Sequence, residues 1–345
     1  MNTPILDRMG SDAEFLLARS AEFEARLVPA HKVIGANKAA ALRSFIGTDG
    51  HNSLGEIRPR PSHHVRQQLY DIASGILSTN EYLRSHKSFK DVYLYASPEY
   101  HGETMAGHVH VSFFVDDPLT KYALSNGRIY GLGAYLQNST TCGLNTPPPP
   151  PVAVNDVPKL AEYAKRACLG ELVTPAVFVT VMDYLVRPFE FWIQPWFARE
   201  RRNSNYGLGV DAARWEQSGV NPGTRPKLRD HAWLHFEYRT PSTWLVHPWL
   251  AYTYLSLVKV SMLNWDFILR LATKDPLAIS RHNTTPGNED ARKLFLSRWE
   301  RVTKEGKLTR DTQLLPKSIA TCEENREAWF SNFGKVQVAE WERVL

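Results

Sequence analysis

Cysteine is scarce in this chain of 345 residues, and its spacing excludes a cross-linked scaffold. Cys142, Cys168 and Cys322 lie far apart, so they form no Cys-x-x-Cys pair and no even-numbered disulfide framework. Domains that depend on disulfides belong to oxidising compartments. We therefore expect a protein of a reducing compartment.

Long apolar runs are also missing. Charged residues interrupt the longest hydrophobic stretches, so we expect no membrane-spanning helix and no membrane partner. The first ten residues contain Asp7 and Arg8 and no apolar run, which argues against a signal peptide. The expected location is the cytoplasm, or the host cytoplasm if a virus encodes the chain.

No block of basic residues marks a nucleic-acid-binding arm. The nearest run, Arg199, Arg201 and Arg202, is explained equally well by a solvated turn. The formal net charge of +5 is small beside 41 basic and 36 acidic residues, so it suits an anionic ligand without implying nucleic acid. The fingerprints GxxxxGK[ST], GxSxG and GxGxxG are absent as well, which leaves no sign of a Walker loop, a nucleophile elbow or a dinucleotide fold.

The pattern of apolar residues predicts a mixture of strands and helices. A hydrophobic content of 43% allows one large core or two modest ones. Alternating segments predict strands, and apolar residues at three- and four-residue spacing predict helices. The predicted strands cover residues 10–18, 40–48, 54–58, 92–96, 108–115 and 233–238. The predicted helices cover residues 62–87, 175–188 and 247–274, and the last 70 residues are predicted to be helical.

Three local signals complete this prediction. Ser62 precedes the first apolar helical repeat and is the predicted N-cap of that helix. Five consecutive prolines, at positions 147–151, predict an exposed polyproline stretch within a loop at residues 146–158. Residues 203–229 are rich in Gly, Asn, Pro and Arg and predict a long loop, and loops of that length are often functional.

Two carboxylates, Asp12 and Glu14, share one face of the first predicted strand, because positions two apart project to the same side. Like charges side by side repel, and a divalent cation between them removes that cost. An exposed acidic strand end is the competing interpretation. Ala13 is predicted to point into the core.

A carboxylate and a guanidinium recur at the same spacing in two later strands, as Glu56 with Arg58 and as Glu237 with Arg239. The carboxylate suits a metal ion, and the guanidinium suits a phosphate or a substrate carboxylate. A surface ion pair of little energetic weight is the alternative for Glu56 and Arg58. The recurrence carries more information than either pair alone.

His108 and His110 share one face of another strand, and Val109, Val111 and Phe113 share the other. No Cys or third His stands at zinc-finger distance, so zinc is not specifically indicated. Imidazoles also join carboxylates around Mn²⁺ or Mg²⁺, or meet a phosphate. A structural role for both histidines is the alternative. Together, the four segments supply the acidic metal ligands and arginines that phosphoryl transfer needs.

The order of these segments resembles a known family. Gly-Ser-Asp-Ala-Glu-Phe, Gly-Thr-Asp-Gly followed by Gly-Glu-Ile-Arg-Pro, Gly-His-Val-His-Val and Phe-Glu-Tyr-Arg-Thr-Pro-Ser-Thr-Trp-Leu follow one another along residues 8–250. They resemble the type-2 carboxylate–amine ligases, which tailed bacteriophages largely encode and which belong to the glutamine synthetase superfamily. The resemblance implies an α+β fold, with a curved antiparallel sheet that cradles ATP and metals, helices on its outer face and a helical C-terminal part.

The resemblance also implies roles for particular residues. The implied metal ligands are Asp12, Glu14, Glu56, His108 and Glu237. The implied phosphate and nucleotide contacts are Arg239, His108, His110, Arg202, Arg214 and Arg229. Arg58 is implied to lie near the substrate. Asp49 is a candidate acceptor of the amine proton, although ordinary turn chemistry also explains it.

The implied reaction forms an amide bond between a carboxylate and an amine, with ATP and Mg²⁺ or Mn²⁺ as cofactors and an acyl phosphate as intermediate. The implied substrates are small molecules, peptides or protein side chains. We expect a ligase domain at residues 1–275, a helical extension at residues 276–345 and no nucleic-acid partner; a homo-oligomer is compatible with the family. A guanidino-kinase type of phosphotransferase and a non-enzymatic interaction protein on a retired ligase fold are the alternatives.

Overall fold

The computed structural model describes about three-fifths of the chain. The described residues are 5–19, 27–34, 46–48, 54–97, 99–100, 103–115, 175–194, 213–215, 232–239, 241–274, 289–331 and 334–345. The predicted proline loop at residues 146–158 and most of the predicted loop at residues 203–229 lie outside them.

An antiparallel sheet organises the described part of the chain. Its strands follow the order β3-β4-β1-β8-β10-β9, and β2 and β5 also pair with β1. These strands are β1 (Ile5–Ala18), β2 (Leu27–Val28), β3 (Ile46–Thr48), β4 (Gly55–Ile57), β5 (Tyr93–Tyr95), β8 (Gly107–Val115), β9 (Ala213–Trp215) and β10 (Ala232–Tyr238). A separate hairpin pairs β6 (Glu99–Tyr100) with β7 (Glu103–Thr104).

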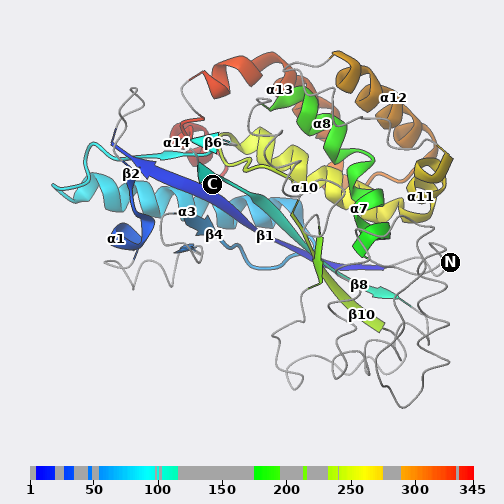
Figure 1. The fold of residues 1–345 in the computed structure, drawn as a ribbon, viewed down its shortest axis with the longest axis horizontal. Helices are drawn as coiled ribbons and strands as arrows, with labels where there is room; N and C mark the ends of the chain where they lie inside the picture. Colours follow the sequence, from blue (N-terminus) through cyan, green and yellow to red (C-terminus); the bar gives the residue numbers. More distant parts are fainter. Residues whose placement is uncertain are drawn as a thin grey trace.

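The helices from residue 175 onward gather on one side of the long strands β1, β8 and β10 in Figure 1. The helices are α1 (Ala30–Ile34), α3 (Val65–Ser85), α7 (Pro175–Asp183), α8 (Val186–Ile193), α10 (Pro248–Leu263), α11 (Trp265–Lys274), α12 (Glu289–Glu305), α13 (Leu315–Phe330) and α14 (Val338–Glu342). Helix α10 contacts β1, α3, α7 and α13, so it is the centre of the helical layer. None of the helices in the described ranges is long and apolar enough to cross a membrane.

The face of β8 and β10 toward the helices is apolar, because alternate residues of these strands are apolar. Val109, Val111 and Phe113 of β8 are fully buried and belong to the main hydrophobic core. The Phe113 ring packs edge-on against Phe236 of β10, with 5.5 Å between ring centroids. It also stacks on Phe178 of α7 at 6.2 Å. Burying rings of this size supplies much of the stabilisation that joins helices to sheet.

The mixed helical and antiparallel fold class is confirmed, and most of the predicted strands are found. The first strand begins earlier than predicted, at Ile5, and ends at Ala18 as predicted. Of the predicted strand at residues 40–48, the structure describes only β3, at its end. Within the predicted loop at residues 203–229, β9 corrects the prediction, because residues 213–215 pair with β10. The ladder to a distant strand overrides the local polar composition.

The N-cap prediction for the first long helix is wrong. Helix α3 begins at Val65, with His64 at the N-cap position and without a side-chain cap from that residue. Ser62 instead pairs with Met9 of β1. The first free backbone N–H of the helix, that of Val65, donates to Asp311 Oδ2 at 2.8 Å. A residue 246 positions away therefore supplies the acceptor that a local cap usually provides.

Two predicted helices are each divided in two. The predicted helix at residues 175–188 breaks after Asp183, and Pro188 lies in the first turn of α8, where its missing N–H costs no helical hydrogen bond. The predicted helix at residues 247–274 breaks at Asn264. The Asn264 side chain donates to Lys307 O at 2.9 Å and accepts from Lys307 N at 2.6 Å, so a distant loop stabilises the break.

Most of the described C-terminal residues are helical, in α12, α13 and α14, whereas residues 276–288 of the predicted helical part lie outside the described ranges. Helices α12 and α13 contact α8, and α13 also packs on α10. Phe295, Trp299 and Cys322 lie in the same hydrophobic cluster as the sheet residues. The division into a ligase domain and an extension at residue 275 stays a prediction.

Candidate active site

The polar face of the sheet brings together chemically active residues from three neighbouring strands. Strand β8 lies between β1 and β10. Its register places His108 opposite Asp12 of β1, and His110 opposite Glu237 of β10. Because residues two apart share a face, the side chains that alternate with the apolar core residues meet on the side away from the helices.

Short polar contacts link these four side chains, here called the Asp12–Glu237 cluster (Asp12, His108, His110 and Glu237). His108 Nδ1 lies 3.0 Å from Glu237 Oε1 and 3.5 Å from Asp12 Oδ1. His110 Nε2 lies 3.1 Å from Asp12 Oδ2. His108 and Glu237 are only 5% and 4% exposed. The side chains of Asp12 and His110 are each 19% exposed, so the cluster opens toward solvent on their side.

The charges of the cluster depend on one another. Burial by itself lowers the pKa of His108, but hydrogen bonds to Asp12 and Glu237 outweigh it and raise the pKa to about 9. Burial raises the pKa of Asp12, but hydrogen bonds from His108 and His110 outweigh it and hold the pKa well below its ordinary value. The same balance, with His108 as the main partner, lowers the pKa of Glu237. At neutral pH both carboxylates are therefore ionised around a protonated imidazole.

The residues fit a divalent cation. Asp12, His110 and Glu237 each offer one ligand atom, and these atoms lie within 4.8 Å of one another. Within the described ranges, Glu237 Oε2 is buried without a hydrogen-bond partner, and Asp12 Oδ1 meets only the His108 ring, 3.5 Å away. Burying such an oxygen is costly unless a cation or water meets it. Two carboxylates and an imidazole suit Mn²⁺ or Mg²⁺ better than they suit a structural zinc.

A second pair of carboxylates lies on the same sheet. Glu14 of β1 and Glu56 of β4 are directly opposite each other in the antiparallel register, and they are 5% and 4% exposed. The Ala106 N–H donates a short hydrogen bond to Glu14 Oε2, and Arg58 makes a close ion pair with Glu56. The predicted ligands Asp12 and Glu14 therefore take part in two adjoining polar groups.

Two arginines border these groups. Arg239 Nε lies 3.4 Å from Glu237 Oε1, and its side chain is 13% exposed. The Arg58 side chain is 55% exposed beside the buried Glu56. A guanidinium carries five N–H donors in a planar fork, so it can contact a carboxylate and a second anion together. The arrangement can therefore bind a metal ion and an anion side by side.

The structure describes most of the predicted site residues, but not all of them. Six of them lie on strands of the described sheet: Asp12, Glu14, Glu56, His108, His110 and Glu237. Arg58 directly follows β4, and Arg239 directly follows β10. Arg214 is described only in its backbone, which pairs with that of Glu237. Asp49, Arg202 and Arg229 lie outside the described residues, so their predicted roles stay predictions.

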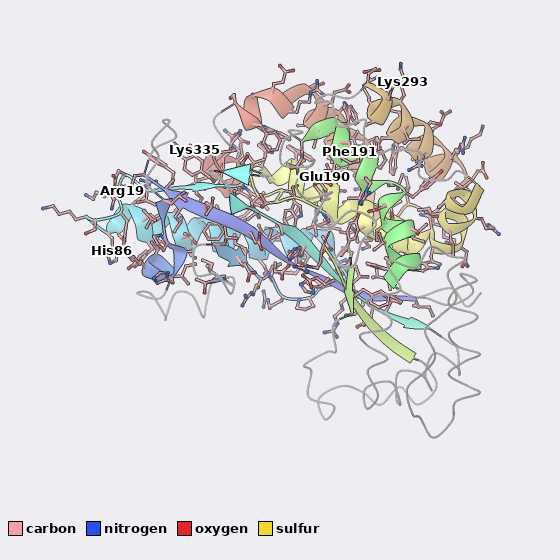
Figure 2. All side chains as sticks on the ribbon, viewed as in Figure 1. Arg19, His86, Glu190, Phe191, Lys293 and Lys335 are labelled. Atoms are coloured by element: carbon pink, nitrogen blue, oxygen red, sulfur yellow. The ribbon has the colours of Figure 1, made fainter. Side chains whose placement is uncertain are left out.

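Sequence patterns missed a buried polar group behind β10. Tyr238 OH donates to Asp183 Oδ1 of α7 at 2.5 Å, and Asp183 Oδ2 lies 3.0 Å from Arg187 Nε. Ser242 N donates to Glu190 Oε1 at 2.8 Å, and Glu190 lies on α8 (Figure 2). The available signal was the presence of three charged residues in otherwise apolar helical segments, since charges are rarely buried unless paired.

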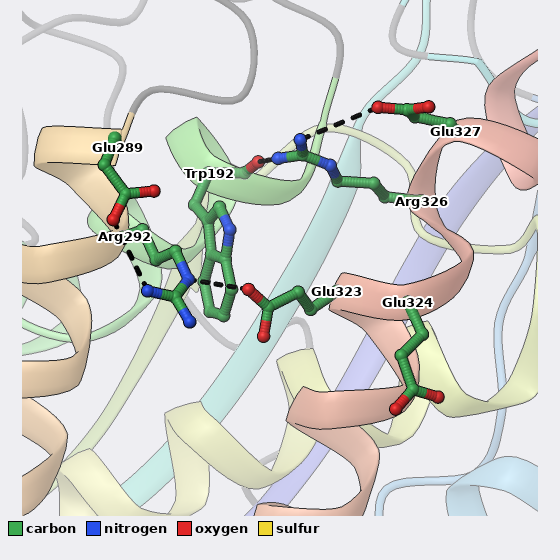
Figure 3. A pocket seen from close by; sticks show the side chains of 7 residues that line it. All are labelled: Trp192, Glu289, Arg292, Glu323, Glu324, Arg326 and Glu327. Carbon is green, nitrogen blue, oxygen red and sulfur yellow. Dashed lines mark hydrogen bonds and ion pairs between the residues drawn. The ribbon is translucent and has the colours of Figure 1, made fainter.

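A cavity of about 390 Å³ lies elsewhere, between α8, α12 and α13, as Figure 3 shows. Arg292 Nε donates to Glu323 Oε1 at 2.6 Å, and Arg326 Nη1 donates to Trp192 O at 3.0 Å. These contacts join the three helices to one another. The cavity contains none of the predicted site residues, so the sheet face remains the candidate active site.

Comparison with models of known protein families gives no match, and comparison with curated proteins gives none either. Solved structures give distant matches. One is a chain from the crystal structure of the complex between the prokaryotic ubiquitin-like protein Pup and its ligase PafA, with 11% identity, a TM-score of 0.46, and coverage of 97% of this chain and 66% of that chain. Another is a glutamine synthase homolog, with 12% identity, a TM-score of 0.41, and coverage of 98% of this chain and 71% of that chain. Since both TM-scores are below 0.5, neither match supports a conclusion about activity.

Proposed function

We propose that this protein is an ATP-dependent ligase that joins a carboxylate to an amine with the help of a divalent cation. One observation carries the proposal. The ligand atoms of Asp12, His110 and Glu237 converge within 4.8 Å on a sheet face where Arg239 also lies against Glu237. Metal ligands beside a guanidinium are the parts that phosphoryl transfer requires.

Each part of the site has a definite task in this proposal. Asp12, His110 and Glu237 hold the cation, which supplies charge neutralisation for phosphate oxygens when it is bound. The guanidinium of Arg239 donates hydrogen bonds to phosphoryl oxygens. Arg58 is much more exposed than the neighbouring Glu56 and is the candidate contact for an incoming carboxylate substrate.

The proposed reaction has two steps, formation of an acyl phosphate and formation of the amide. The substrate carboxylate attacks the γ-phosphorus of ATP, which gives an acyl phosphate and ADP. The amine then attacks the acyl carbon, phosphate leaves, and the amine loses a proton to form the amide. The first step is shared with phosphotransferases, so the choice of a ligase rests on the order of the four sequence motifs.

ADP release in the presence of Mg²⁺ or Mn²⁺ tests the proposal. Amino acids, short peptides and mixed carboxylate–amine pairs form the substrate panel. We expect ADP release that requires both a carboxylate and an amine, and that is lost in Glu237→Gln. Asp71→Asn is the matched control. The Asp71 side chain, on α3, is 4% exposed, against 5% for Glu237, and it is ion-paired with Arg60 rather than with the cluster.

The alternatives predict different results. ADP release with a phosphorylated product and no amide identifies a phosphotransferase. Absence of both Mn²⁺ and ATP binding in calorimetry contradicts any enzymatic function for this site and favours a binding protein. Equal loss of activity in Glu237→Gln and Asp71→Asn indicates that general instability, rather than the cluster, explains the effect.

A further inference from the structure

The segment that follows β10 continues along the start of β8. Gly107 N donates to Pro241 O at 2.9 Å, and Thr243 N donates to Met105 O at 3.0 Å. Ala106 pairs with Ser242, whereas Val109 pairs with Tyr238. Between these two pairs the chain advances four positions after β10, from Tyr238 to Ser242, but only three positions on the β8 side, from Ala106 to Val109.

Thr243 connects this segment to β1. Its Oγ1 donates to the backbone oxygen of Glu14 at 2.6 Å, and its side chain is fully buried. Glu14 is two residues from Asp12 on the same strand face. Since β8 lies between β1 and β10, the Thr243 hydroxyl links the two outer strands of the site across the end of the central one.

Trp244 connects the same segment to β8. Its Nε1–H donates to Gly107 O at 3.1 Å, and the indole is fully buried. A Cβ added at Gly107 would lie 2.4 Å from Trp244 Nε1, so only glycine allows this approach. Gly107 directly precedes His108. The indole therefore determines the position of the backbone from which His108 reaches Asp12 and Glu237.

We propose that Thr243 and Trp244 are positioning residues of the metal site. Their side chains join the ends of β1, β8 and β10 through two buried hydrogen bonds to backbone oxygens, and so set the distances between carboxylates and imidazoles on the opposite face. Neither of the two hydrogen bonds reaches a side chain of the Asp12–Glu237 cluster. Metal affinity depends on ligand geometry, so the two hydrogen bonds act on binding as well as on stability.

The inference rests on the proposed function, because it requires a cation at Asp12, His110 and Glu237. The test is calorimetric titration of the full chain with Mn²⁺ alone. Thr243→Val removes the hydroxyl at nearly constant volume, and we expect the Kd for Mn²⁺ to rise roughly tenfold, as for loss of an outer partner of a metal ligand. Trp244→Phe removes the indole donor, and we expect a rise in the same direction.

A matched control separates positioning from stability. Thr253 is also fully buried, and its Oγ1 donates to the backbone oxygen of Trp249 at 2.8 Å, but it lies on α10. We expect Thr253→Val to lower Tm as Thr243→Val does and to leave the Kd for Mn²⁺ unchanged. Thr243→Ser retains the hydroxyl and should bind Mn²⁺ within about twofold of the unmodified protein.

The outcomes distinguish the two proposals. If the unmodified protein binds Mn²⁺ and Thr243→Val binds it equally well, the positioning role is wrong and the proposed function stands. Equal weakening in Thr243→Val and Thr253→Val also rejects the positioning role. If the unmodified protein binds no Mn²⁺, the proposed metal site is wrong and the positioning role is rejected with it. Should Thr243→Val fail to fold, Trp244→Phe and Thr243→Ser decide the question by the same measurements.

Discussion

Two buried histidines, one on each side of the sheet, respond to burial in opposite ways. His108 on the polar face is 5% exposed and His247 in the helical layer is 6% exposed. The pKa of His108 is raised to about 9, whereas burial lowers the pKa of His247 to about 4. His108 faces two carboxylates, and His247 stacks on Trp329 with 4.4 Å between ring centroids. Neighbouring charge, rather than depth, therefore distinguishes the two environments.

The comparison extends to the whole sheet. Along β8, Val109, Val111 and Phe113 join the hydrophobic core, while His108 and His110 face carboxylates. Apolar burial stabilises the fold, and a cluster of ionised groups is costly to bury unless its members compensate one another. The apolar residues on the helical face thus stabilise the fold, and this stability offsets the cost of holding charged side chains on the opposite face. The predictions below test this division, beginning with the largest expected effect.

Phe113→Ala should cause the largest loss of stability. The Phe113 ring contacts Phe178, Phe236 and Trp265 in the core. Removing a buried Phe side chain typically costs about 3–5 kcal/mol, through lost transfer free energy and the cavity left behind. Urea unfolding measures the change in the free energy of unfolding. Ser112→Ala, one residue away on the opposite face, should cost about 1 kcal/mol or less. Equal losses in the two variants would contradict the division between faces.

The pH dependence of stability should reveal His247. Its pKa is about 4 in the folded protein, against 6.5 for an exposed imidazole as in the unfolded chain, because burial disfavours the charged form. Between these values the unfolded chain binds a proton that the folded protein does not, so the free energy of unfolding decreases as pH falls. The loss attributable to this group approaches about 3 kcal/mol at pH 4 and is absent above pH 6.5.

His247→Asn is the comparison for this effect. His247 Nδ1 accepts from Trp249 N at 3.1 Å as the N-cap of α10, and an Asn oxygen can replace that acceptor without titrating. Unfolding measured from pH 7 to pH 4 should show a smaller decrease in the variant. Identical pH profiles would mean that His247 does not titrate differently in the two states.

The sequence could predict the faces of the strands and could not predict their register. Asp12 and Glu14, or Glu237 and Arg239, are two residues apart, so strand geometry alone places each pair on one side. Nothing local brings Asp12 opposite His108, because that pairing depends on contacts between distant strands. The same limit explains the errors at helix ends. Asp311 accepts from the first turn of α3, and Lys307 holds the break at Asn264.

Asp12→Asn should weaken metal binding on the polar face with little effect on the core. The substitution keeps the shape of the side chain and removes one anionic ligand from the group formed with His110 and Glu237. We expect the Kd for Mn²⁺ to rise by roughly a hundredfold or more, because losing a ligand should cost at least as much as losing an outer partner, which costs up to about a hundredfold. Calorimetry with Mn²⁺ measures it. Asp71→Asn, in α3, should leave the Kd unchanged, and a change there would contradict the assignment of the cluster.

Tyr238→Phe should produce the smallest effect, and it tests whether the polar group behind β10 belongs to the core or to the site. The variant keeps the buried ring and removes the hydroxyl that donates to Asp183 Oδ1. Loss of one hydrogen bond should lower the free energy of unfolding by about 1 kcal/mol. Tyr252→Phe, which removes the donor to Asp311 O at 2.9 Å, should cost a similar amount. If Tyr238→Phe also weakens Mn²⁺ binding and Tyr252→Phe does not, the hydrogen bond of Tyr238 on the core face affects the position of Glu237 through the β10 backbone. If neither variant changes the Kd, the two faces are energetically separate at this strand, and the coupling is confined to Thr243 and Trp244.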